Sequence, residues 1–347
     1  MRSRYPVAIA LVLAAISSPT ASAAACSWTP TTLPLPASRV AAVVTAADSG
    51  GGFAGEASSQ RILGSPTVDA VRWSGGAVTN LGTLPGHLNS VNVTGVNKSG
   101  TVVGDAGETN LTQRRAFRST GSALTPLPEP SGYDSSWATG VNDAGDIVGH
   151  VGKEVQSGVN IYTVHTAVLW PASAPGTVVK LSGGLPTTGQ TMATGVDQDG
   201  TVLVEHFPTQ TDAFTATNLY LWKASAARKL TIPSGTSSVE AISIANGRVA
   251  GTLYSSSTSN GRGVLWDQNG AAVLAANSAG LHSVNRSGQS IGFTTATALT
   301  YGVWQLGTAT TTLSGTLAVN VSADSGAVAG WSRATGSNNQ PTVWRCA

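Results

Sequence analysis

Four places in the chain put an acidic or imidazole side chain directly after the glycine or valine that ends a short apolar segment. They are Glu56, Asp105, His150 and the pair Glu205-His206. Carboxylates and imidazoles that converge in one place could orient a sugar by hydrogen bonding, or act as general acid and base. A second interpretation is that they are solvated strand ends, because the equivalent positions elsewhere are Thr252, Phe293 and Trp331.

No other pattern in the chain carries recognisable chemistry. The five histidines include no pair with the spacing of a zinc-binding motif, and there is no nucleophile elbow, phosphate loop or dinucleotide fingerprint. The segment 197–200 (Asp-Gln-Asp-Gly) resembles the start of a calcium loop but lacks the downstream glutamate. We therefore predict no metal site and no cofactor, and we assign no catalytic residue.

These candidates sit within a module that recurs along the chain. The segment 138–149 reads Ala-Thr-Gly-Val-Asn-Asp-Ala-Gly-Asp-Ile-Val-Gly, with close copies at 93–104 and 193–203 and weaker ones at 43–55, 241–251, 281–292 and 319–330. A second module follows each copy and usually ends in tryptophan, at Trp73, Trp170, Trp222, Trp266, Trp304 and Trp344. The period is about 45 residues, which is typical of propeller blades.

Each repeat predicts four short strands, here called a, b, c and d in chain order. A tight polar hairpin joins a to b, and longer loops join b to c. Strand a carries a small residue at one repeated position, as expected for strands crowded around an axis: Gly95, Gly140, Gly195, Ser243 and Ser283. We predict an all-β, seven-bladed β-propeller of four-stranded blades, whose last blade is completed and whose ring is closed by the N-terminal strand.

The first residues are typical of a secretory signal peptide. Arg2 and Arg4 precede an apolar run over 6–16 and the small residues of 21–23. We expect residues 1–23 to be removed, 24–347 to form a single propeller domain, and the protein to be secreted. Cys26 and Cys346 lie at the two ends of the mature chain and predict one disulfide that closes the ring. The rival interpretation is a lipoprotein acylated at Cys26, although the usual leucine three residues earlier is missing.

The small number of charged residues and their near-neutral balance argue against a nucleic-acid partner. Only 10% of residues are charged, and after Arg2 and Arg4 are removed 17 of the 19 basic residues remain against 17 acidic ones. No basic cluster suggests nucleic-acid binding, and no mature segment is long and apolar enough to insert into a membrane. We expect a monomer.

The module resembles a family of bacterial secreted proteins with HAF extracellular repeats. The resemblance rests on 142–149 (Asn-Asp-Ala-Gly-Asp-Ile-Val-Gly) followed by 167–170 (Ala-Val-Leu-Trp), while 115–117 (Arg-Ala-Phe) comes nearest to the signature triplet. It covers nearly the whole mature chain and implies a secreted propeller. No functional residue of the family maps onto this sequence.

Two functions follow from these features. The first is a non-enzymatic secreted binding or scaffold protein that recognises a carbohydrate or another cell-surface ligand; the second is a propeller glycosidase or lyase. The absence of catalytic motifs favours the first. Long b–c loops, such as 151–163 and 207–217, and the d–a links share one face, where we expect the main pocket. The residues expected to bind ligand there are Glu56, Asp105, Tyr133, Trp137, His150, Glu205 and His206.

Overall fold

The structure is a computed structural model. It describes residues 27–59, 67–87, 90–107, 113–158, 160–209, 216–256, 258–295, 300–334 and 337–346. Within these ranges the chain forms 28 strands and no helix, and therefore no helical segment of a length and hydropathy suited to a membrane span.

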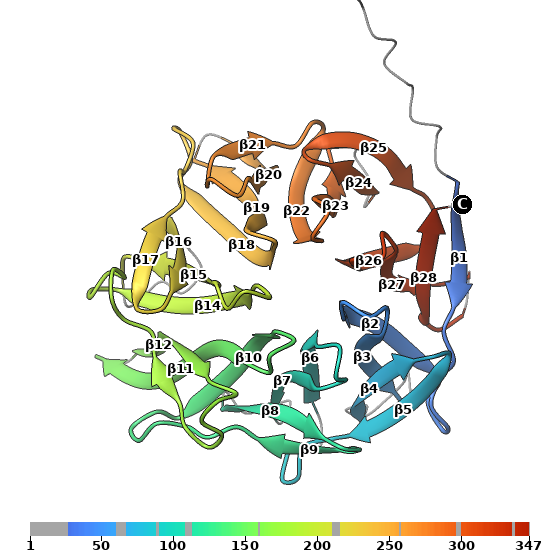
Figure 1. Cartoon of the computed structure of the whole chain (residues 1–347), viewed down its shortest axis with the longest axis horizontal. Coiled ribbons are helices and arrows are strands. Elements are labelled where there is room, and N and C mark those ends of the chain that lie inside the picture. The colour runs from blue at the N-terminus through green and yellow to red at the C-terminus, as the bar shows by residue number, and fades with distance from the viewer. Residues whose placement is uncertain are drawn as a thin grey trace, which may run out of the picture.

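The described strands form seven antiparallel four-stranded sheets arranged as blades around a central axis (Figure 1). Blade 1 contains β2 (Ala41–Ala47), β3 (Phe53–Ser58), β4 (Val68–Ser74) and β5 (Ala77–Gly82). Blade 2 contains β6 (Ser90–Val96), β7 (Val102–Gly107), β8 (Arg114–Thr120) and β9 (Ala123–Pro126). Blade 3 contains β10 (Ser135–Val141), β11 (Ile147–Ser157), β12 (Asn160–Trp170) and β13 (Val179–Lys180).

Blade 4 contains β14 (Gln190–Val196), β15 (Val202–Phe207), β16 (Asn218–Lys223) and β17 (Ala226–Lys229). Blade 5 contains β18 (Ser238–Ala245), β19 (Arg248–Ser255), β20 (Thr258–Trp266) and β21 (Ala272–Leu274). Blade 6 contains β22 (Ser278–Val284), β23 (Gln289–Thr294), β24 (Tyr301–Gln305) and β25 (Thr308–Leu313). Blade 7 contains β26 (Leu317–Ser322), β27 (Val328–Ser332), β28 (Gln340–Cys346) and β1 (Trp28–Thr32).

The predicted seven-bladed ring, closed by the N-terminal strand, is confirmed. Strand β1 pairs antiparallel with β28, and Trp28 lies opposite Cys346. The first and last segments of the chain therefore share one sheet (Figure 1). Cys26 precedes Trp28 by two residues but lies outside the described residues, so its disulfide with Cys346 stays a prediction.

The b–c connection of blade 3 differs from the sequence prediction. The segment 151–163 was expected to be a loop, but most of it belongs to β11 and β12, which pair continuously from Ile147–Trp170 to Ser157–Asn160. The alternating polar and β-branched residues of this segment suit a twisted hairpin, and these two strands are the longest among those described.

The inner strand of every blade contains a bulge at the same place. In blade 3 the register with β11 shifts between Ala138 and Gly140, so that Thr139 is the extra residue. The bulge brings the inner strand so close to its neighbour that a side chain at Gly149 would collide with the carbonyl oxygen of Trp137. This explains why the repeated module ends strand b with glycine in six of the seven blades.

The tryptophans of strand c join neighbouring blades. Each of the six is at most 7% exposed. The indole nitrogen donates a hydrogen bond to the link that enters the same blade, at 2.8 Å from Trp73 to the Pro34 carbonyl and at 2.7 Å from Trp170 to the Pro128 carbonyl. Trp222, Trp266 and Trp304 make equivalent bonds. These five tryptophans thus bury a large apolar area while the single polar atom of each stays paired.

A ring of hydrogen bonds surrounds the axis. The bulged residue of one inner strand donates its side-chain hydrogen to a backbone carbonyl of the next, for example from Thr194 to the Ala241 carbonyl at 2.7 Å. Thr45, Thr94, Thr139, His282 and Asn320 do the same over 2.6–2.8 Å. Blade 5 has Ile242 at this position, and its side chain is 47% exposed in the channel.

Replacing Thr194 with valine should lower the free energy of unfolding by about 1 kcal/mol, because the Ala241 carbonyl loses its donor. Ile242→Thr should raise it by about 0.5–1 kcal/mol, because the new hydroxyl can extend the ring and little apolar burial is lost. Urea unfolding measures both, with the exposed Thr312→Val as the control. A Thr194→Val variant as stable as the wild type would show that the ring contributes nothing.

The predicted disulfide is tested by intact mass. The oxidised protein should be lighter than the reduced protein by two hydrogens, and replacing both cysteines with serine should cost about 2–5 kcal/mol of stability. Two alkylatable thiols, or a diacylglycerol adduct on Cys26, would contradict the prediction.

Candidate functional site

The predicted polar residues occupy equivalent places on strand b, near the end of the channel where the b–c loops lie. Glu56, Asp105, His150 and Glu205 pair with inner-strand residues Val43, Asn92, Trp137 and Met192, respectively. Each of the four therefore occupies the same position in its own blade, as expected. Their exposure differs from the expectation, because Asp105 is 2% exposed and Glu205 6%.

Glu56 and Glu205 each bind the backbone of the following blade. Glu56 Oε1 accepts a hydrogen bond from the Val93 amide at 3.0 Å, and Glu205 Oε1 accepts one from the Ala241 amide at 2.7 Å. Burial raises the pKa of Glu56 to about 7 and that of Glu205 to about 8, although these amides lower both. Each carboxyl group is thus part of a joint between two blades.

Asp105 is held within its own blade. Its carboxylate forms an ion pair with Arg114 and accepts a hydrogen bond from the Asn92 side-chain amide at 3.1 Å. Burial raises the pKa of Asp105, while Arg114 and Asn92 oppose the rise. This carboxylate therefore has little hydrogen-bonding capacity left for a ligand.

His150 belongs to an aromatic cluster on the long hairpin of blade 3. Its ring stacks on Trp137 with centroids 4.9 Å apart, and the His165 ring meets it edge-on at 5.0 Å. Burial lowers the pKa of His150 to about 3 and that of His165 to about 4, so both rings are neutral at physiological pH. His165 was missed because it joins the cluster only through the pairing of β11 with β12.

The remaining two predicted residues are also engaged. The Tyr133 hydroxyl lies 3.3 Å from Thr166 Oγ1, and the Lys180 ammonium lies 4.6 Å from the centre of the Tyr133 ring. Burial raises the pKa of Tyr133, but the Thr166 and Lys180 contacts outweigh it and leave a lowered pKa. His206 Nε2 is 2.9 Å from the Thr188 carbonyl. Of these two, Tyr133 is partly exposed and His206 is buried.

The sequence missed a group of side chains beside Glu205. Glu240 lies on the inner strand β18 and is exposed, and its carboxylate accepts a hydrogen bond from the Tyr254 hydroxyl at 3.0 Å. Its charge contributes to the raised pKa of Glu205 and opposes the burial that lowers the pKa of His282. The sequence prediction rested on the residues that end strand b. Glu240 lies instead on strand a, just before its bulge.

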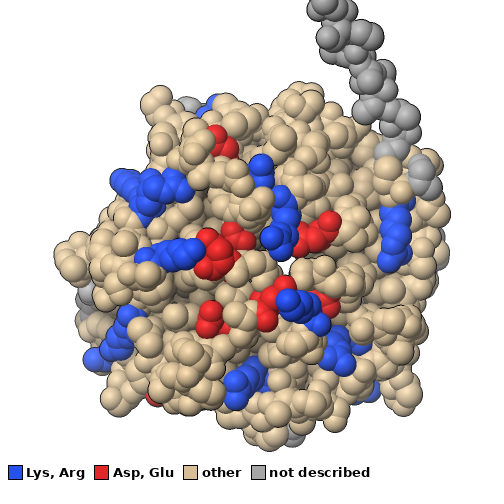
Figure 2. Space-filling view, in the orientation of Figure 1, with Lys and Arg blue, Asp and Glu red and all other residues tan. Residues whose placement is uncertain are grey.

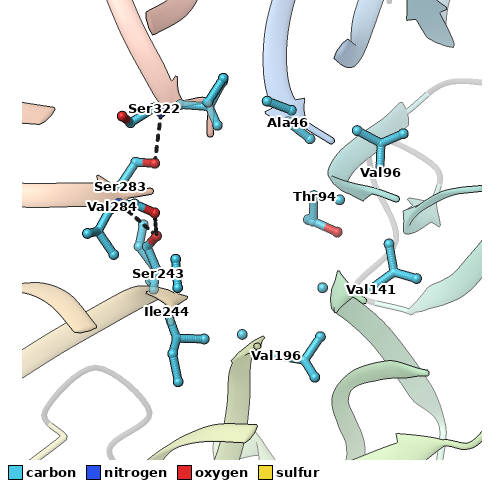
Figure 3. Close-up of a pocket in the computed structure, with 18 of the residues that line it drawn as sticks. Ala46, Thr94, Val96, Val141, Val196, Ser243, Ile244, Ser283, Val284 and Ser322 are labelled. Carbon is cyan, nitrogen blue, oxygen red and sulfur yellow. Dashed lines mark hydrogen bonds between the residues drawn. The ribbon is translucent and has the colours of Figure 1, made fainter. Parts of the chain in front are cut away.

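A cavity of about 440 Å³ occupies the channel at the opposite end, where the a–b turns lie (Figure 3). Val96, Val141 and Val196 line one side, and the other side is lined by Ser243, Ile244, Ser283, Val284 and Ser322. None of the seven predicted binding residues lines it. This cavity lies at the a–b end, whereas parts of most b–c loops fall outside the described residues. The pocket expected among the b–c loops therefore stays a prediction.

Charged turn residues surround this cavity. Acidic and basic side chains alternate around the opening of the channel (Figure 2). Neighbouring turns are linked, because Asp143 accepts a hydrogen bond from the Lys98 amide at 2.9 Å and Asp197 accepts two from the Asn246 and Gly247 amides. The carboxylates thereby hold the rim of the cavity in place.

Among the residues that the structure describes, no group of three or more His, Cys, Asp or Glu side chains is placed to hold a metal ion.

No family model and no curated protein matches the chain in sequence. Solved structures match it in fold. An acylaminoacyl peptidase from Pyrococcus horikoshii has a TM-score of 0.59 at 10% identity, over 88% of this chain and 51% of the peptidase. A prolyl endopeptidase reaches 0.60 at 11% identity, over 89% of this chain and 50% of that one. The chain thus spans about half the length of these peptidases.

An oligogalacturonate lyase, solved in complex with manganese, is similar along nearly its whole length. The TM-score is 0.55 at 11% identity, over 92% of this chain and 96% of the lyase. At these identities the likeness establishes the propeller fold alone.

Stability should fall as the pH rises through the range in which Glu205 loses its proton. Its pKa is about 8 in the folded protein against 4.5 for the unfolded reference, so the folded state binds more protons between these values. The stabilisation is complete below about pH 4.5 and is lost on approaching pH 8. His150 and His165 have lowered pKa values in the folded protein, so they make the stability rise with pH, but only below pH 6.5.

The measurement is urea unfolding between pH 6.5 and 8. Glu205→Gln should flatten the decline, because an amide is neutral throughout, while Glu154→Gln on the exposed surface of β11 should keep the wild-type slope. An unchanged slope in Glu205→Gln would contradict this assignment.

Proposed function

We propose that the protein is a secreted, non-enzymatic binding or scaffold propeller that recognises carbohydrate at the b–c end of its channel. The observation that supports a binding role over catalysis is the state of the predicted acids. Glu56, Asp105 and Glu205 each accept hydrogen bonds that join strands or blades. A general acid or base must exchange protons with a substrate, and carboxyl groups buried in such joints are poorly placed for it.

Aromatic side chains at the same end supply a surface for sugar rings. Trp137 is partly exposed on the inner strand of blade 3, and Phe293 is 36% exposed in blade 6. Trp331 in blade 7 is also partly exposed, and the Arg333 guanidinium lies 5.7 Å from its ring centre. The apolar face of a sugar stacks on such rings, while neighbouring polar groups bond its hydroxyls.

The cellular setting of this proposal comes from the sequence. The signal-peptide pattern over 1–23 and the resemblance to HAF-type extracellular repeats both support secretion. The proposal further takes the protein to be a monomer with a carbohydrate or cell-surface ligand.

A glycosidase or lyase is the second candidate, and one observation favours it. Glu205 has a pKa of about 8, and the exposed carboxylate of Glu240 lies near enough to raise it. Paired carboxyl groups with separated pKa values are the usual arrangement for acid and base catalysis of glycoside cleavage. Glu240→Gln should abolish any hydrolytic activity found if this candidate is right.

The test is a glycan array combined with a hydrolysis screen on the same preparation. We expect binding without product release. Trp137→Ala and Trp331→Ala should each weaken binding of the selected glycan by about tenfold, since stacking on an aromatic ring contributes on the order of 1–1.5 kcal/mol. Leu306→Ala, an exposed apolar truncation at the opposite end, is the matched control. Unaltered binding in both tryptophan variants, or turnover of the glycan, would refute the proposal.

A further inference from the structure

The cavity at the a–b end is lined by both apolar and charged side chains. The apolar ones are Val96, Val141, Val196, Ile244, Val284 and Val321, together with the exposed Ile242. The charged ones come from turns at the rim and include Arg286, Asp324, Asp48 and Asp197. A ligand here can therefore pair its charges with rim residues and place an apolar group against the valines (Figure 3).

Arg286 presents an unpaired guanidinium to this cavity. Its backbone is fixed on both sides, because its amide donates to Asp324 Oδ1 at 2.9 Å and its carbonyl accepts from Asn246 and Arg248. Its side chain makes no hydrogen bond or ion pair within the described part of the chain. A fixed backbone with an exposed guanidinium that no described protein group engages suits recognition of a carboxylate.

The space beside Arg286 comes from the short turn of blade 5. There the two residues Asn246 and Gly247, both with positive φ, replace the longer turns of the neighbouring blades. A second cavity of about 270 Å³ results, and it shares Asp197, Gln198 and Arg286 with the first. Arg286 therefore stands between the two cavities, where a ligand group can reach it.

Two carboxylates on the same arc of the rim, Asp324 in the next blade and Asp48 in the one after it, also retain free acceptor capacity. Asp324 uses Oδ1 for the Arg286 amide, and Asp48 uses Oδ1 for the Gly50 and Gly52 amides. Their Oδ2 atoms have no hydrogen-bond partner within the described residues. Because blades 6, 7 and 1 are consecutive in the ring, the cationic donor Arg286 and the anionic acceptors Asp324 and Asp48 lie along one arc of the rim.

We propose that this cavity binds a zwitterionic α-amino acid with an apolar side chain. The ligand carboxylate pairs with Arg286, its ammonium group pairs with Asp324 and Asp48, and its side chain lies against the valines and isoleucines of blades 2 to 5. A ligand with only a negative charge would meet three lining carboxylates, Asp48, Asp197 and Asp324. A ligand with only a positive charge would leave Arg286 unpaired.

The test uses three compounds of similar shape: L-leucine, isoamylamine, which lacks the carboxylate, and isocaproate, which lacks the ammonium group. Isothermal titration should show that leucine binds about tenfold or more tightly than either partial mimic, because each loses one charge-assisted contact. Leucine that fails to bind at millimolar concentration, or binds no better than the mimics, overturns the proposal.

Variants separate the two contacts. Arg286→Gln should weaken leucine about tenfold or more and leave isoamylamine unchanged, while Asp324→Asn should weaken leucine and leave isocaproate unchanged. Ile242→Trp should abolish binding by filling the cavity. Lys98→Gln is the matched control, because Lys98 occupies the same turn position in blade 2 but does not line the cavity. Equal effects of Arg286→Gln on leucine and isoamylamine overturn the assignment.

The site is independent of the proposed carbohydrate site. Trp137→Ala should leave leucine binding intact, and Arg286→Gln should leave glycan binding intact. Loss of both activities in either variant would indicate a folding defect and would be checked by the melting temperature. With unchanged melting, such a loss overturns the assignment of two separate sites.

Discussion

Close approach of seven inner strands around one axis is the constraint on which the rest of the structure depends. At Gly95 an added side-chain carbon would come within 3.3 Å of the Val141 amide and 3.4 Å of the Gly140 α-carbon in the next blade. The inner strands tolerate this proximity because small residues face the axis and because each strand bulges at the same point. In six of the seven blades the bulge frees a side chain to bond with the next blade, so the bulge both relieves the crowding and links the blades.

The same constraint accounts for the fate of the polar residues at the b–c end. A backbone amide that faces the neighbouring blade needs a partner when it is buried, and Glu56 and Glu205 supply one. Their raised pKa values are a consequence of this burial. Perturbed carboxyl groups often mark active sites, but here the joints between blades explain the perturbation equally well. Glu240, exposed and outside any joint, is the acid in this region that remains accessible to solvent.

Differences among the blades give the two ends of the channel different surfaces. At the b–c end, Trp137 and Trp331 stand on the inner strand of one blade and the second strand of another. At the a–b end, the small inner-strand position is glycine on blades 2 to 4 and serine on blades 5 and 6, while the next residue stays β-branched and apolar in all five. A regular repeat would give a uniform ring. Departures at Ile242 and in the Asn246-Gly247 turn make one side of the ring distinct, and both of our proposed sites depend on such irregular positions.

The sequence by itself determined the all-β class, the seven repeats, the four strands in each and the closure by the N-terminal strand. These features follow from local periodicity, from glycine where an inner strand bulges, and from tryptophan where blades meet. The location of the cavity, the long hairpin over 147–170 and the partners of Glu56, Glu205 and Asp105 were decided by the tertiary structure. The physical reason is that Glu205 meets the Ala241 amide, and Arg286 faces Asp324, only after the ring has brought residues about one repeat apart into contact.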